Sequence, residues 1–266
     1  MHAYVEPMTT AAAQQQLVDW IIVAARQRSS STALSCAIAA DMGSCASIYL
    51  DELYQGGTAQ HALYSAMGSS SSSSPWESPT VRQRKMHPLQ FLRHAREVAC
   101  NSSNLRARLT KQSKEVCSTA AERFATNCNM SHSTQNGCTL VFKLFDIHGV
   151  RFLNSLFAHS PSCVVVLRRT IADEECSYRW ALLTGDWTTN RHSGTLRNQQ
   201  GSALENFRTS NCTNLPTASF ARSHEQWFGR LYRYLRGTRH LNATFEESIY
   251  QRARLLQRVR AVCHAP

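Results

Sequence analysis

The sequence lacks several patterns that assign a chain to a common class. Its ten cysteines include no Cys-x-x-Cys pair, so we expect neither a zinc ribbon nor a thioredoxin-type motif. No run approaches the roughly 20 apolar residues that a membrane-spanning helix needs. The N-terminus has no basic start followed by an apolar stretch, so no signal segment is predicted there. Acidic residues are scarce as well, with 18 Asp and Glu against 29 Lys and Arg.

The shortage of acidic residues leaves a formal net charge of +11. A surplus of basic side chains raises the local concentration of anions at a protein surface. Most of the surplus is Arg, whose guanidinium matches phosphate and sulfate oxygens geometrically. Nucleotides or sulfated donors, acidic glycans and nucleic acid all fit such a surface, and so does a basic surface without any specific partner.

With 266 residues, the chain is long enough for one α/β domain with a substantial core. Residues 1–16 are polar and rich in Ala and Gln, which predicts a loose terminus before a single domain over residues 17–266. Six consecutive serines at 69–74, followed by two nearby prolines, predict a flexible loop at about 65–80.

Three apolar runs predict buried strands: Val18–Ala25, Thr139–Phe145 and Cys163–Leu167. We expect helices from Thr32 to about Ala40 and from about Ile171 to Leu183. Strands joined by crossover helices pair in the parallel sense. The pattern therefore predicts an α/β fold of three layers, with a central parallel sheet flanked by helices.

The remaining elements are less regular. The basic stretch over residues 84–125 is predicted to be helical in part. A helix is expected to begin at Ser223, with Gln226 completing a capping box, and to end near Gly237. A short strand over 241–245 and a final helix reaching Cys263 complete the expected elements.

Two polar segments follow predicted strands. The first runs from Arg26 to Thr32 and precedes a helix. Unpaired N–H groups and the dipole at a helix N-terminus favour an anion, and Arg28 adds positive charge. The segment is not a Walker A loop, because its Gly-Lys-Ser/Thr ending is absent.

In the second segment, Arg169 ends a strand and Ser177 lies two turns along the next helix. Together they suit a second phosphate, whereas Thr170 and Asp173 indicate a helix cap. The strand ends in Arg rather than the Asp that holds magnesium, which argues against an ATPase or P-loop kinase. No metal is expected.

These two segments together resemble those of the sulfotransferases that use 3'-phosphoadenosine-5'-phosphosulfate (PAPS). In that family an Arg-Ser-Gly-Ser-Thr loop often holds the 5'-phosphosulfate, and an Arg and a Ser eight residues apart, with Asp midway, hold the 3'-phosphate. The resemblance covers about residues 18–54 and 139–187 and is nearest to the bacterial, algal and carbohydrate enzymes. The matching residues are Arg28, Ser29, Ser30, Ser31 and Thr32 in the first segment, and Arg169, Asp173 and Ser177 in the second.

The resemblance implies a P-loop-type fold and transfer of a sulfuryl group from PAPS to a hydroxyl acceptor such as a carbohydrate, without a metal. Arg28 would stabilise charge on the leaving oxygen. Glu52 is the predicted base, since related enzymes often carry an acidic motif after the first helix. Weaker candidates for the base are Asp51, His61 and His148. Lys143, in the middle of a strand, either extends to solvent or faces the acceptor.

Two alternatives stay open. Ser30 stands where the family usually has Gly, and a positive φ there would strain it, which favours a catalytically impaired sulfotransferase-like protein. The net charge also suits a protein that binds polyanions, either RNA or sulfated glycan. No RNA-binding motif is present and aromatics are not interleaved with the basic residues of 82–114, so nucleic acid is not the expected partner.

The sequence leaves two cellular compartments as alternatives. A polar segment brings four cysteines close together in sequence, and they fit either disulfides in the Golgi lumen or free thiols in the cytoplasm. These cysteines are Cys100, Cys117, Cys128 and Cys138. Four glycosylation sequons, which matter only in a secreted chain, begin at Asn101, Asn129, Asn211 and Asn242.

Overall fold

The computed structural model describes a little over half of the chain. The described residues are 18–27, 31–42, 47–50, 63, 66–67, 88–117, 138–146, 150, 153–184, 212 and 216–263.

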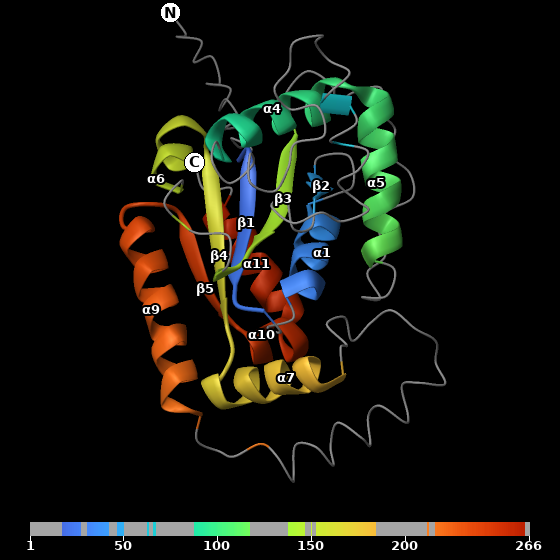
Figure 1. The fold of residues 1–266 in the computed structure, drawn as a ribbon. Helices are drawn as coiled ribbons and strands as arrows, with labels where there is room; N and C mark the ends of the chain where they lie inside the picture. The colour runs from blue at the N-terminus through green and yellow to red at the C-terminus, as the bar shows by residue number, and fades with distance from the viewer. Residues whose placement is uncertain are drawn as a thin grey trace, which may run out of the picture.

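Five strands form one all-parallel sheet in the order β2-β3-β1-β4-β5 (Figure 1). They are β1 (Trp20–Ala25), β2 (Ser47–Tyr49), β3 (Thr139–Leu144), β4 (Ser162–Arg168) and β5 (His240–Thr244). Strand β1 is central and pairs in parallel with both β3 and β4. The three strands predicted from apolar runs are confirmed to within one or two residues at each end.

Eight helices accompany the sheet in the part of the chain that the structure describes. They are α1 (Ser31–Asp41), α4 (Pro88–Asn101), α5 (Ser103–Cys117), α6 (Leu153–His159), α7 (Ile171–Thr184), α9 (Ala218–Tyr234), α10 (Phe245–Tyr250) and α11 (Arg252–Cys263). The helices predicted after the first and the third apolar runs are α1 and α7.

Two apolar cores cover the two faces of the sheet, because successive side chains of a strand point to opposite faces. Ile22 and Phe142 pack with α4, α5, α6 and α9 on one face. Ile21 and Val23 pack with α1 and α11 on the other. All six residues of β1 are buried, as expected for a strand covered on both sides. The predicted three-layer α/β fold is confirmed.

The predicted start of α9 is wrong. The helix begins at Ala218 with Thr217 as its N-cap, so Ser223 lies inside it. The side chain of Thr217 makes no capping hydrogen bond within α9 and donates instead to Glu175 of α7. A capping group supplied by a distant helix leaves no local sequence signal. The capping box of this region lies at Thr244 and Glu247, where it starts α10.

The connections around β1 run to different faces of the sheet. Helix α1, which follows β1, packs on one face, whereas α6 and α9 pack on the other. In open parallel sheets, a crevice forms at the carboxyl ends of the strands where the connections change face. Helix α7 lies across this edge of the sheet (Figure 1).

Four disulfides link the described elements. They join Cys36 to Cys117, Cys100 to Cys138, Cys163 to Cys263 and Cys176 to Cys212. No described cysteine is free. Of the cysteines clustered in sequence, Cys100 and Cys138 pair with each other, whereas Cys117 pairs with Cys36 of α1. Cys45 and Cys128 lie outside the described residues. Within the described ranges, no helix combines the length and apolar character needed to cross a bilayer.

We expect the disulfide between Cys163 and Cys263 to be a major source of stability. It closes the longest loop of the four, with a sequence separation of 100. Replacing both residues with Ala should lower the free energy of unfolding by roughly 2–5 kcal/mol and Tm by roughly 5–15 °C, measured by calorimetry. Wild type in a reducing agent is the comparison. Reaction of both thiols with a labelling reagent in the folded, unreduced protein would contradict the pairing.

Candidate functional site

The two predicted anion-binding segments leave the sheet at the same edge. Ala25 of β1 is paired in register with Leu167 of β4, and neighbouring strands lie about 4.8 Å apart. The chain after β1 leads to the N-terminus of α1, and the chain after β4 leads through Arg169 to α7. The sheet therefore brings together two segments that lie more than a hundred residues apart.

The N-terminus of α1 has a buried lysine beside it. Ser31 is the first residue of the helix and is buried. The Lys143 ammonium donates to Thr32 Oγ1 over 2.9 Å, and Lys143 is only 3% exposed. Lys143 neither extends to solvent nor belongs to the pocket described below. Arg28, Ser29 and Ser30 lie outside the described residues.

The segment after β4 keeps the expected local structure. The Thr170 hydroxyl donates to Asp173 Oδ2 over 2.5 Å and accepts from the Asp173 backbone N–H, so the predicted helix cap at the start of α7 is confirmed. The Arg169 guanidinium lies over the ring of Phe245, 4.4 Å from its centre. Ser177 lies on α7 and is half-buried. Their role in binding a phosphate stays a prediction.

The predicted base Glu52 and its competitors Asp51, His61 and His148 lie outside the described residues.

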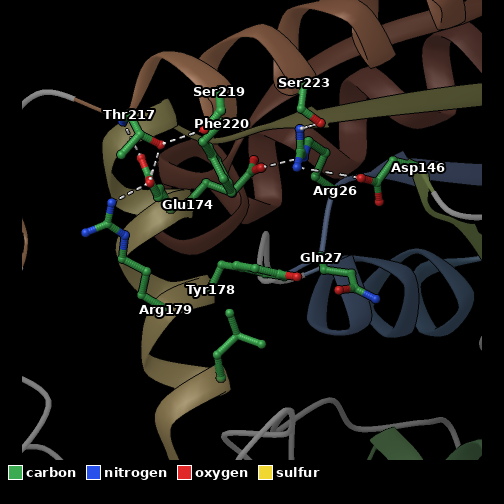
Figure 2. A pocket seen from close by; sticks show the side chains of 12 residues that line it. Arg26, Gln27, Asp146, Glu174, Tyr178, Arg179, Thr217, Ser219, Phe220 and Ser223 are labelled. Atoms are coloured by element: carbon green, nitrogen blue, oxygen red, sulfur yellow. Dashed lines mark hydrogen bonds and ion pairs between the residues drawn. The ribbon is translucent and has the colours of Figure 1, made fainter.

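A pocket of about 450 Å³ lies at this edge, at the carboxyl ends of β1 and β3 and between α7 and the start of α9. Arg26 and Gln27 line it from the end of β1, and Asp146 lines it from the end of β3. Figure 2 shows the Arg26 guanidinium between Asp146 and the carboxyl group of Glu174, with Ser223 of α9 above it. Arg26 and Gln27 are the first two residues of the first predicted anion-binding segment.

The centre of the site is an ion pair between Arg26 and Glu174, with 2.8 Å between Nε and Oε1. The same guanidinium lies 3.6 Å from the carboxylate of Asp146 and donates to Ser223 Oγ over 3.3 Å. It also lies over the Phe220 ring, 4.7 Å from its centre. Arg26 is 8% exposed and Glu174 only 1%, so both side chains are largely removed from water.

Burial shifts the pKa of Glu174 and of His224, which lies beside it. It raises the pKa of Glu174 to about 8, against the opposing effect of Arg26. His224 is fully buried, with Nε2 3.7 Å from Glu174 Oε2 and Nδ1 3.4 Å from Glu225 Oε1. Burial, together with Arg168 and Arg26, lowers the pKa of the imidazole.

A second carboxylate ties the two walls of the pocket together. Glu175 of α7 accepts from the Thr217 backbone N–H over 2.8 Å and from the Thr217 hydroxyl over 2.7 Å. Arg179 donates to the same carboxylate over 2.7 Å. Burial alone would raise the pKa of Glu175, but these hydrogen bonds lower it. A disulfide also bonds Cys176 of α7 to Cys212, which precedes α9 in the chain.

Sequence reasoning missed Glu174 and His224 as site residues and treated Arg26 only as part of a loop. Arg26 had a detectable signal, since it is the first charged residue after a buried strand. Glu174 lies beside two other acidic residues in sequence, and only the fold shows that it is buried. Nothing in the sequence around His224 distinguishes it from a surface residue.

Comparisons of the chain with protein-family models, with curated proteins and with solved structures find no match. The sulfotransferase resemblance therefore depends on the two short motifs alone. No group of three or more His, Cys, Asp and Glu side chains is placed to hold a metal ion within the described ranges.

We expect Glu174→Gln to change how stability depends on pH. Between its ordinary pKa of 4.5 and about 8, Glu174 keeps a proton in the folded state that the unfolded chain releases. Stability then falls as the pH rises, by at most about 1.4 kcal/mol per pH unit. Gln cannot titrate, so the variant should show a flatter plot of Tm against pH.

Because the pKa of His224 is lowered, its titration makes stability rise with pH below the ordinary pKa of 6.5. Wild type and Glu174→Gln are therefore best compared between about pH 6.5 and 8. Glu225→Gln is the matched control, because the Glu225 side chain is 62% exposed and should leave the slope unchanged. An identical slope in wild type and Glu174→Gln would show that Glu174 is ionised when folded.

Proposed function

We propose that the protein is a sulfotransferase that takes a sulfuryl group from PAPS and passes it to a hydroxyl acceptor. The observation that supports this most is the buried ammonium of Lys143 at the N-terminus of α1. The dipole of a helix already makes its N-terminus positive. The Lys143 ammonium donates to Thr32 in the first turn of α1, so it adds positive charge where the sequence motif predicts the 5'-phosphosulfate.

The shared sheet edge gives further support. Arg169 and the start of α1 follow neighbouring paired strands. Both segments therefore lie at one edge of the sheet, where a ligand with anionic groups at two positions would reach each of them. Adenosine-3',5'-bisphosphate, the product of PAPS, has such a distribution of charge.

When bound, PAPS supplies the activated sulfuryl group, and its transfer leaves negative charge on a phosphate oxygen. The chain would stabilise that charge with Arg28, with the N–H groups of the first turn of α1 and with Lys143. Ser31 and Thr32 add hydroxyl donors at the same turn. Arg169 and Ser177 would hold the 3'-phosphate, and Glu52 would take the proton from the acceptor hydroxyl.

We also propose that the protein works in an oxidising compartment such as the Golgi lumen. Disulfides persist in secretory compartments and are rare in the cytosol, and all eight described cysteines are paired. Two sequon asparagines among the described residues, Asn101 and Asn242, are exposed.

Arg169→Ala and Ser177→Ala test the 3'-phosphate site. Each should weaken binding of adenosine-3',5'-bisphosphate by roughly 10- to 100-fold, as expected for the loss of a charge-assisted hydrogen bond. Binding of adenosine-5'-monophosphate, which lacks the 3'-phosphate, should change little. Titration calorimetry measures both.

Arg168→Ala is the matched control, since the Arg168 guanidinium lies over Phe228 and has no assigned part in binding. Equal losses for the two nucleotides would reject the 3'-phosphate assignment. Tighter binding of ATP with magnesium than of the bisphosphate would favour a kinase. Nucleotide-independent binding with a steep salt dependence would favour a polyanion-binding protein.

Glu52→Gln tests the base. We expect a loss of turnover of about 10²- to 10⁴-fold with unchanged affinity for adenosine-3',5'-bisphosphate, because the amide cannot accept the proton of the acceptor. A normal rate would remove Glu52 from this role. A wild-type protein that binds the donor and transfers sulfate to no acceptor would instead match the impaired enzyme.

A further inference from the structure

The described residues of the pocket between α7 and α9 give it charged walls without a surplus of positive charge. Its three carboxylates, from Asp146, Glu174 and Glu175, face two guanidinium groups, from Arg26 and Arg179. Each guanidinium lies within 2.8 Å of a carboxylate oxygen. An anionic ligand would have to displace one of these carboxylates, so the pocket does not suit phosphate, sulfate or an acidic sugar.

Uncharged polar groups and apolar surface make up the rest of the wall. Gln27 and Ser219 line the pocket, and Ser223 accepts from Arg26 and keeps its own O–H as a donor. The rings of Tyr178 and Phe220 lie 6.0 Å apart at 51°. A purely apolar ligand would leave these polar groups without partners.

An exposed leucine extends the apolar surface at the rim. Leu182 lines the pocket and is 59% exposed, whereas its neighbour Leu183 is 73% exposed and does not line it. Sugar rings combine an apolar C–H face with hydroxyl groups along the edge, which matches a wall of this composition. The volume of about 450 Å³ lies in the usual range for small-molecule sites, roughly 300–1,000 Å³.

We infer that this pocket binds a neutral, hydroxyl-rich group such as a glycosyl residue, and that this group carries the acceptor hydroxyl. The inference that such a group binds depends on the residues that line the pocket, whereas its role as the acceptor rests on the proposed sulfotransferase function. The residue positions on α7 agree with separate subsites for the glycosyl group and for the 3'-phosphate of the donor. Glu174, Tyr178 and Leu182 recur every four residues along the pocket, whereas Ser177 is turned by about 100° from Tyr178.

Saturation-transfer NMR on the full chain tests the inference directly. The neutral probes are the methyl glycosides of glucose, galactose and mannose, and the anionic counterparts are methyl glucuronide and methyl galacturonide. We expect signals from at least one neutral glycoside and affinity roughly tenfold lower for its uronide, because the added carboxylate meets the carboxylates of the wall.

Two matched pairs of variants locate the binding. Ser219→Trp places a large side chain in the pocket and should abolish the signal. Ala218→Trp, one residue earlier on the exposed start of α9 and outside the pocket, should keep it. Leu182→Ala should weaken the signal and Leu183→Ala should not. Thermal melts of all four variants show whether each one folds.

Each outcome has a defined meaning. Absence of binding by every neutral glycoside, equal binding of the uronides, or retention of the signal in Ser219→Trp would each overturn the inference. Displacement of the glycoside by adenosine-3',5'-bisphosphate would assign the pocket to the adenine of the donor and would overturn it as well. Glycoside binding by a protein that does not bind the bisphosphate would support the pocket and reject the sulfotransferase.

Discussion

Parallel pairing of β1 with a strand on each side is the constraint on which the candidate site depends. The register pairs Ala24 with Leu144 and Ala25 with Leu167, so the chain leaves all three strands at one edge of the sheet. Because both faces of β1 are covered by apolar cores, groups at its end are drawn away from water. Arg26, directly after the strand, is consequently buried and needs carboxylate partners, which come from α7 and from the end of β3.

Two environments of different charge result at this edge. On the side of α1, Lys143 adds an ammonium to the positive end of a helix. On the side of α9, Arg26 and Arg179 are each matched by a carboxylate of α7. The alternation of side chains along β3 contributes to this division, because it turns Lys143 toward the α1 face and Phe142 toward the opposite face. The proposed donor, with several negative charges, and the proposed neutral acceptor would therefore bind on different sides of one edge of the sheet.

The disulfides connect this site to the rest of the fold. Cys163 in β4 is bonded to the end of α11, so the helical layer on one face is held covalently to the sheet. Cys176 in α7 is bonded to Cys212, close before the N-cap of α9. Helix α7 is thus joined to the N-cap of α9 by the hydrogen bonds of Glu175, and to the chain before α9 by a disulfide.

The sequence by itself determined the three central strands, the helices α1 and α7 and the cap at Thr170, because buried parallel strands are continuous apolar runs and such caps are local. It also indicated that Arg169 and Thr32 belong near a common edge. Only the tertiary structure decided that Glu174 and His224 are buried, that Lys143 reaches α1, that α9 begins at Ala218 and which cysteines pair. Each of these features depends on contacts between segments far apart in the chain. The physical effects involved are desolvation, ion pairing and capping by a remote carboxylate, and none of them produces a pattern in the local sequence.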